Sequence, residues 1–118
     1  MIQKISRGDI YSLNLDPTRG SEQAGTRPCV IIQNDVGNEY SSTTIIVPCT
    51  TNLDKIYPTE VLLTARETGL DQDSKVKCDQ IRTVDKRRLL TKKGRVPPDK
   101  MRLIDRALKI SLGLEPIP

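Results

Sequence analysis

A continuous apolar run from Cys29 to Ile32 restricts the fold of this chain more than any other feature. Successive residues of a strand point to opposite faces, so a run without polar residues has no face to turn to water. Pro28 comes just before the run and fixes its own φ, which suits the first residue of a strand. The sequence therefore predicts a central strand over residues 28–33.

Other short runs have the alternation or the β-branched composition that is typical of strands. With the central strand they give six predicted strands, over residues 10–15, 28–33, 43–47, 59–63, 75–81 and 90–96. Pro48 is expected to close the third of these. Between the strands we expect a turn at residues 34–38, a polar loop at 64–74 and a single helical turn at 84–89.

Only the C-terminal part has the period of a helix. Pro97, Pro98 and Asp99 favour a helix start, and Gly113 is a suitable stop. Between them one apolar stripe recurs at spacings of three and four, formed by Met101, Ile104, Ala107, Leu108, Ser111 and Leu112. The sequence thus predicts a mainly β fold with a C-terminal helix, a small bent sheet or barrel in one domain over residues 1–118.

Three cysteines and the absence of an apolar span or leader indicate the compartment. Cys29, Cys49 and Cys78 each lie within a strand-like run rather than at paired spacings, and the chain has no histidine to complete a zinc site. No run is apolar enough to cross a membrane. We expect reduced core thiols, no metal or other cofactor, no membrane association and a cytoplasmic location.

The net charge of +4 is unevenly distributed. Residues 1–74 hold 6 basic and 10 acidic residues, whereas residues 75–109 hold 13 basic and 4 acidic ones, a balance of +9. Such a concentration indicates a surface for a polyanion, with nucleic acid as the first candidate, although part of it is an ordinary solvated face. With three tyrosines, no Phe and no Trp, the chain is poor in side chains for stacking bases.

Polar groups gather where the central strand begins. Residues 19–25 form a polar run in which Gly20 and Gly25 allow a tight loop. The run leads through Arg27 into the strand, and a rigid strand end is where functional loops are usually mounted. A plain surface hairpin is the alternative.

Six ordered blocks resemble the MazF/PemK family of toxin endoribonucleases. They are residues 7–11 (RGDIY), 20–28 (GSEQAGTRP), 32–35 (IQND), 48–51 (PCTT), 79–85 (DQIRTVD) and 110–112 (ISL). The resemblance implies an SH3-like β-barrel, a two-fold homodimer and metal-independent, sequence-specific cleavage of single-stranded RNA. It also implies a cognate MazE-like antitoxin, whose acidic, disordered segment would lie across the RNA groove.

The resemblance also assigns the catalytic residues, each with a chemical reason. Cleavage through the ribose 2′-OH needs a base, a stabiliser for the charged phosphorane and help for the leaving oxygen. Arg27 matches the family's catalytic arginine, whose planar donor fork suits a phosphate. Thr50 matches its catalytic threonine and can donate to a non-bridging oxygen. Glu22 is our candidate base, with loop bracing as its alternative role.

Other polar residues of these blocks and of the strands are candidates for base reading or phosphate positioning. They are Ser21, Gln23, Asn38, Thr51, Lys77, Asp79 and Gln80. Asp79 matches an aspartate that some family members use in catalysis. Those members have an arginine in place of Lys77 and a histidine near the first loop, so the Arg27/Thr50 form of the site is favoured.

Two other functions fit the same pattern. A gyrase-poisoning toxin of the same fold is one, although it has no need of the phosphate-stabilising pair Arg27 and Thr50. A non-catalytic RNA-binding module is the other, since the basic region alone would serve it.

Overall fold

Seven strands, three α-helices and one 3-10 turn make up the computed structural model, which describes residues 4–118. In chain order they are β1 (Asp9–Asn14), β2 (Thr26–Ile31), α1 (Asp35–Tyr40), β3 (Thr43–Thr50), β4 (Glu60–Leu63), α2 (Ala65–Thr68), β5 (Ser74–Lys77), β6 (Arg82–Asp85), η1 (Lys86–Arg88), β7 (Lys92–Arg95) and α3 (Pro98–Ser111).

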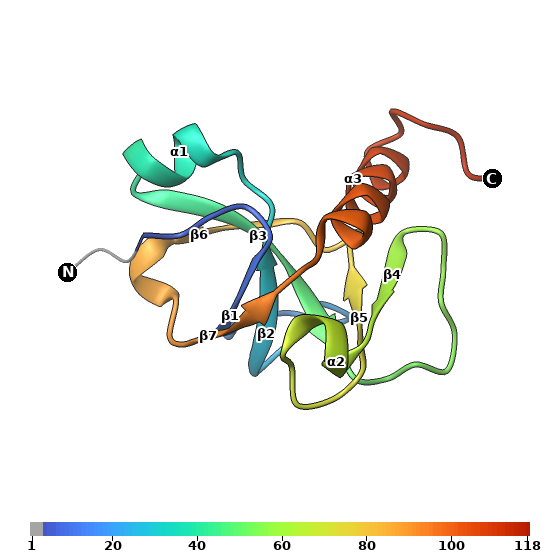
Figure 1. Ribbon diagram of the computed structural model, residues 1–118, viewed down its shortest axis with the longest axis horizontal. Helices are drawn as coiled ribbons and strands as arrows, with labels where there is room; N and C mark the ends of the chain where they lie inside the picture. Colours follow the sequence, from blue (N-terminus) through green and yellow to red (C-terminus); the bar gives the residue numbers. More distant parts are fainter. Residues whose placement is uncertain (1–3) are drawn as a thin grey trace.

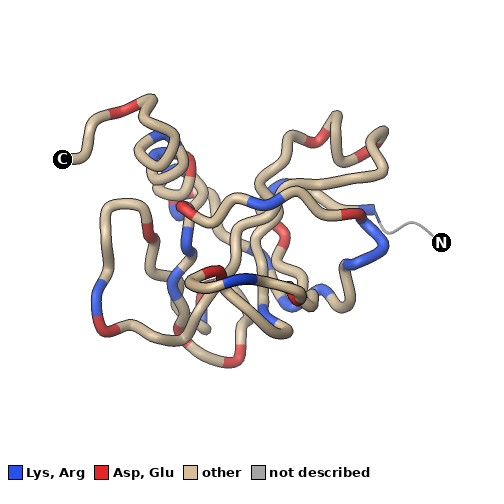
Figure 2. Tube along the Cα trace, turned by 180° about the vertical axis from the view of Figure 1, so that it is seen from behind, with Lys and Arg blue, Asp and Glu red and all other residues tan. Residues whose placement is uncertain are grey.

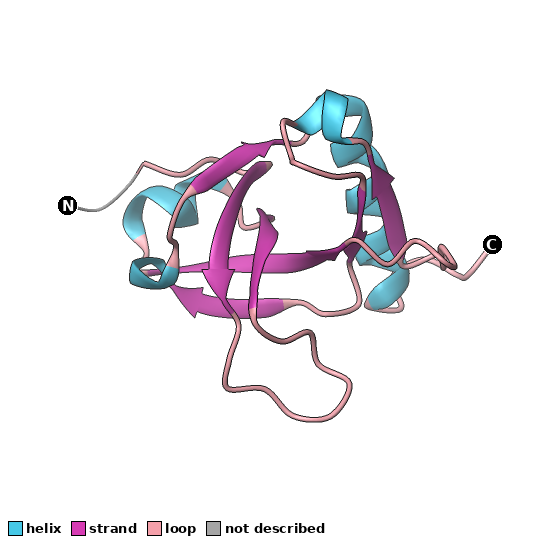
Figure 3. Cartoon of the chain, turned by 90° about the horizontal axis from the view of Figure 1, so that it is seen from below, coloured by secondary structure: helices cyan, strands magenta, loops and turns pink. Residues whose placement is uncertain are grey.

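The strands form one antiparallel sheet in the order β4-β5-β3-β2-β1-β7, and β6 also pairs with β3. The sheet curves into a partly closed barrel, with α1 at one end and α3 at the other (Figures 1 and 3). The predicted mainly β fold with a C-terminal helix is confirmed. No helix within residues 4–118 is long and apolar enough to cross a membrane.

β3 has more strand partners than any other strand of this sheet. One edge pairs with β2, while the other pairs with β6 at residues 43–46 and with β5 at Cys49 and Thr50. The prediction that Pro48 closes this strand is wrong, because β3 continues to Thr50. Pro48 lies where the second edge changes partner, a position that can accommodate a missing N–H.

Two apolar cores lie on the two faces of the curved sheet. The first joins the sheet to α3 and includes Ile10, Val30, Val47, Cys49, Val61, Leu63, Val76, Ile104 and Ala107. The second includes Tyr11, Leu13, Leu15, Cys29, Ile31, Ile46, Val84 and Leu89. All three cysteines are buried free thiols, as the sequence predicts.

The C-terminal helix α3 begins at Pro98 and packs its apolar stripe against the first core. Ile104 and Ala107 are buried as expected, but Leu112 is 62% exposed and Ile110 is buried instead. Leu112 lies after the last helical residue, just before Gly113 at φ +74° turns the chain away.

Three connections are more regular or shorter than the sequence predicts. The predicted turn at 34–38 is the start of α1, because the Asn34 side chain accepts the Gly37 N–H as an N-cap. The predicted loop at 64–74 contains α2, which begins with a capping box between Thr64 and Glu67. The predicted strand 75–81 ends at Lys77. A turn follows, and β6 begins only at Arg82.

Candidate active site

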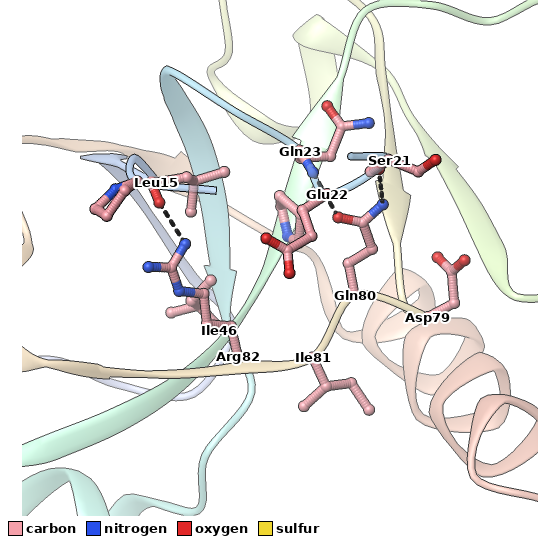
Figure 4. A pocket seen from close by; sticks show the side chains of 11 residues that line it. Leu15, Ser21, Glu22, Gln23, Ile46, Asp79, Gln80, Ile81 and Arg82 are labelled. Atoms are coloured by element: carbon pink, nitrogen blue, oxygen red, sulfur yellow. Dashed lines mark hydrogen bonds between the residues drawn. The ribbon is translucent and has the colours of Figure 1, made fainter. Parts of the chain in front are cut away.

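A groove lies between the β1–β2 loop and the turn that links β5 to β6. It has a volume of about 620 Å³ and is lined by Leu15, Pro17, Ser21, Glu22, Gln23, Ile46, Pro48, Asp79, Gln80, Ile81 and Arg82. Figure 4 shows the polar side chains of the loop facing those of the turn. Five predicted site residues thus share one surface.

Gln80 fixes the β1–β2 loop in this groove. The Gln23 N–H donates to Gln80 Oε1 at 2.7 Å, and Gln80 Nε2 donates to the Ser21 carbonyl at 3.3 Å (Figure 4). Gly20 and Gly25, at φ +54° and +77°, give the loop the left-handed backbone that it needs. One side chain therefore holds two points of the loop in place.

Glu22 braces the same loop. Its Oε1 accepts the Arg19 N–H at 2.7 Å, while Oε2 accepts no hydrogen bond from residues 4–118. Glu22 lines the groove and not the pocket that holds Arg27. Its bracing contact is thus observed, and one carboxylate oxygen is left to face the groove.

Arg27 and Thr50 meet in a second pocket, at the ends of β2 and β3. β2 and β3 pair with Cys29 opposite Pro48, and this register, continued by two residues, places Arg27 opposite Thr50. The pocket has a volume of about 320 Å³ and includes Thr51. Two residues 23 positions apart in the sequence thus line one pocket where β2 begins and β3 ends.

The hydrogen bonds of this pocket leave donors free for a ligand. Arg27 Nε donates to the Ala24 carbonyl at 2.7 Å, which fixes the guanidinium and leaves both terminal nitrogens without a partner in residues 4–118. Thr50 Oγ1 accepts the Asn52 N–H at 3.3 Å, so its own hydroxyl hydrogen is free to donate. A rigid cationic fork and a hydroxyl donor together can hold a phosphate.

Two predicted substrate-binding residues lie outside both pockets. Asn38 is 3% exposed, and its amide bonds to Gln33, Thr44 and Asp35, so it holds α1 against the sheet. Asp35 in turn accepts the Arg7 N–H as well as the Asn38 amide, and these bonds lower the pKa of its carboxyl. We correct the role predicted for Asn38 to a structural one.

Lys77 is the second predicted substrate-binding residue outside both pockets, and it belongs to a buried cluster of charged side chains. Its Nζ lies 2.9 Å from Glu60 Oε2, and Lys75 Nζ lies 3.1 Å from Glu60 Oε1. Burial raises the pKa of Glu60, but hydrogen bonds from the Tyr57 N–H, Lys77 and Lys75 outweigh burial, so the net pKa is lowered. Lys75 also donates to the Lys55 carbonyl at 2.6 Å. The cluster therefore anchors the β3–β4 loop, beside Thr50, instead of offering Lys77 to a ligand.

The sequence reasoning missed several polar residues of these surfaces, among them Arg82, Ser74 and Thr26. Arg82 lines the groove and donates through Nη1 to the Leu15 carbonyl. Ser74 lines the pocket of Arg27 and Thr50. Arg82 belongs to the block DQIRTVD that the sequence analysis singled out, so its basic side chain was a usable signal; Ser74, in a predicted loop, gave none.

The three buried thiols are poor nucleophiles. Burial raises the pKa of Cys29 and of Cys78 to about 12, and that of Cys49 even further. Across residues 4–118, no group of three or more His, Cys, Asp or Glu side chains could hold a metal ion.

Basic residues are frequent in η1 and β7, and η1 is a continuous blue stretch of the tube in Figure 2. Arg88 donates to the carbonyls of Asn14 and Asp16, just before the β1–β2 loop. Much of the positive charge is neutralised locally, for example by Asp9, which pairs with Arg95 at 2.6 Å. The basic region is thus partly structural and partly adjacent to the groove.

Residues 6–112 match the sequence model of a family described as PemK-like, MazF-like toxin of type II toxin–antitoxin system. The chain belongs to this family. The ordered sequence blocks predicted this family, and the match confirms the prediction. The match covers most of this PemK/MazF toxin.

Known relatives agree in sequence and in structure. A protein named Endoribonuclease MazF, from Staphylococcus epidermidis, is 49% identical over 111 residues, which cover 93% of this chain and 92% of the relative. The crystal structure of MazF from Deinococcus radiodurans has a TM-score of 0.82 at 28% identity, over 94% of this chain and 98% of that one. An endoribonuclease in complex with its cognate antitoxin, from a mycobacterial species, has a TM-score of 0.78 at 29% identity, over 94% and 97% of the chains.

Proposed function

We propose that this PemK/MazF toxin is a sequence-specific, metal-independent endoribonuclease that cleaves single-stranded RNA in the cytoplasm and so arrests translation and growth. The observation that carries the proposal is that Arg27 and Thr50 line one pocket. The 49% identical relative named as an endoribonuclease supports the reaction class.

The pocket suits attack by the ribose 2′-OH on the adjacent phosphodiester. The 2′-OH gives its proton to a base, the P–O5′ bond breaks, and the leaving 5′-oxygen takes a proton from water, which gives a 2′,3′-cyclic phosphate and a free 5′-OH. Charge that develops on the non-bridging oxygens would be stabilised by the terminal nitrogens of Arg27 and by the Thr50 hydroxyl. Arginine keeps its proton under working conditions, so Arg27 acts as an electrostatic stabiliser rather than as an acid.

Glu22 is the proposed general base. Its Oε1 is committed to the Arg19 N–H, which fixes the carboxylate, and Oε2 is available to take the 2′-OH proton. Because Glu22 lines the groove and Arg27 the neighbouring pocket, the RNA would pass from one to the other. Ser21, Gln23 and Gln80 would then contact the bases that lie in the groove.

We propose two protein partners. A second copy of the chain would complete a homodimer, and exposed Leu62 and Leu103 beside the hollow between β4 and α3 support such an association. A cognate antitoxin would inhibit the enzyme by laying an acidic segment across the groove, as the antitoxin complex of the mycobacterial neighbour supports.

The test is cleavage of a long single-stranded RNA in EDTA, with the ends of the products mapped. Arg27→Ala should lower cleavage by at least ~10²-fold, the usual effect of losing one transition-state donor. Arg66→Ala is the matched control, since it removes the same charge from the exposed surface of α2. Near-normal cleavage by Arg27→Ala would refute the site.

The remaining outcomes separate the other functions. Discrete cuts that leave 2′,3′-cyclic phosphates establish the proposed reaction. Inhibition of gyrase with intact RNA would identify a topoisomerase poison instead, and RNA binding without any cut would identify a passive binding module.

A further inference from the structure

A third hollow adjoins the pocket of Arg27 and Thr50. Its volume is about 220 Å³, and three of its lining residues, Pro28, Thr51 and Ser74, also line that pocket. The two hollows therefore lie side by side. Beyond the shared residues, the third hollow is bounded by the loop after α2 and by Lys93 of β7.

The wall made by the loop after α2 is rigid. The Ala65 N–H donates to Asp73 Oδ1 at 2.7 Å, which closes the loop on itself, and Leu70 is buried in the first core. A Cβ added to Gly94 would lie 2.0 Å from the Thr68 carbonyl oxygen, so the backbone of α2 lies directly against β7. The hollow thus exists before any ligand binds.

A β-bulge places Lys93 at this hollow. β7 pairs with β1 so that Ile10 lies opposite Gly94 and Tyr11 opposite Lys92, which leaves Lys93 as the extra residue. Bulges redirect side chains and are frequent next to active sites. Lys92 forms an ion pair with Asp9, whereas Lys93 has no ion pair with any of residues 4–118.

Polar side chains around the hollow are uncommitted. Asp71 and Gln72, on the loop after α2, and Thr51, at the end of β3, have side chains without a hydrogen bond to residues 4–118, and all three are exposed. By contrast, the hydroxyl of Ser74, which also lines the hollow, donates to the Gln72 carbonyl at 3.1 Å. A cation, a carboxylate, an amide and a hydroxyl therefore converge without internal partners.

We propose that this hollow is a nucleotide subsite that holds the RNA residue flanking the scissile phosphodiester. Lys93 would bind the neighbouring phosphate, and Gln72 and Asp71 would read the base edge. Since a carboxylate only accepts hydrogen bonds, Asp71 favours a base with an exocyclic amino group over uracil, whose one N3–H donor lies between two carbonyl oxygens. The inference rests on the proposed endoribonuclease function.

Lys93→Ala is the first test, with Lys92→Ala as its control, because both remove one positive charge from the same strand. On a long RNA, Lys93→Ala should raise KM about 10-fold with kcat little changed, and lower the slope of log affinity against log salt by about 1. Lys93→Arg should restore KM. Lys92→Ala should leave KM and the salt slope near wild type.

Truncated substrates localise the effect. On a series of oligonucleotides shortened from either side of the cut, the difference between wild type and Lys93→Ala should disappear once the flanking nucleotide is removed. If the difference persists on the shortest substrate, or if Lys92→Ala behaves like Lys93→Ala, the charge acts at long range and the subsite is refuted.

Base preference is the second readout. Sequencing the cut ends from a random RNA library should show that Asp71→Asn and Gln72→Ala relax selection at one flanking position by about 10-fold, without altering the others. Unchanged selection at every position refutes the subsite while wild-type cleavage still upholds the proposed function. A wild-type protein that does not cleave in EDTA overturns both.

Discussion

Glu60 offers a direct test of how the site is supported, because it carries one buried carboxylate between two ammonium groups. Its side chain is 2% exposed, and those of Lys75 and Lys77 are 8% and 17% exposed. Glu60→Ala would leave both lysines without their counter-ion. Breaking a buried ion pair from one side costs about 3–5 kcal/mol, a large part of the roughly 5–15 kcal/mol that stabilises a typical domain.

Urea unfolding at pH 7, followed by circular dichroism, measures this cost. Glu115→Ala is the matched control, because Glu115 also lies between two cations, Arg106 at 3.5 Å and Lys109 at 3.8 Å, but at the exposed C-terminal tail. Its removal should change the free energy of unfolding by less than about 1 kcal/mol. Equal midpoints and equal slopes for the Glu60 and Glu115 variants would refute the reasoning.

The pH dependence gives an independent check with Glu60→Gln, which keeps the shape of the side chain. The folded pKa of Glu60 lies below its ordinary value of 4.5, so the carboxylate stabilises the fold above pH 4.5 and loses this effect as pH falls through the folded pKa. The stability difference between wild type and Glu60→Gln should therefore be largest near neutral pH and shrink in acid. A constant difference from pH 7 to pH 3 would contradict it.

Three further outcomes are expected. Gly94→Ala should destabilise the fold by about 1–3 kcal/mol in urea unfolding, because its Cβ would meet the Thr68 carbonyl oxygen at 2.0 Å; an unchanged midpoint would show that β7 and α2 separate easily. Iodoacetamide at pH 8 should leave Cys29, Cys49 and Cys78 unmodified in the folded protein and label all three in urea, as read by mass spectrometry, since burial raises the pKa of each thiol. RNA affinity should fall steeply between 50 and 200 mM salt in a filter-binding assay, and a flat response would count against phosphate contacts.

The elements that the sequence predicts well are those with a strong local pattern. The alternation at residues 10–15, the apolar run after Pro28 and the stripe of α3 correspond to β1, β2 and the terminal helix. One error falls where a nonlocal partner decides, whereas the missed helices α1 and α2 begin with local caps at Asn34 and Thr64. β3 continues through Pro48 because its other edge changes strand there, and no property of residues 43–50 alone reveals this change.

The site residues also fall into two groups, those that the sequence predicts and those whose position depends on the fold. The resemblance to the toxin family pointed to Arg27 and Thr50, and the two residues line one pocket at the adjoining ends of β2 and β3. The sequence placed Asn38 in a turn. It lies instead in α1, which Asn34 caps, and its buried side chain accepts the Thr44 hydroxyl. Lys93 could not be selected from the sequence, because its position depends on a bulge against β1 rather than on its own neighbours in the chain.

β3 pairs with three strands, and these pairings fix its register. A slip of one residue in its register would turn Cys49 towards the site and push Thr50 into the apolar core, and all three partner strands oppose such a slip. The β1–β2 and β3–β4 loops pair with no strand, and side-chain contacts hold them instead, from Gln80 in the first loop and from Lys75 in the second. Under the proposed function, substitutions at loop positions outside these contacts would change which RNA is recognised while Thr50 stays in place.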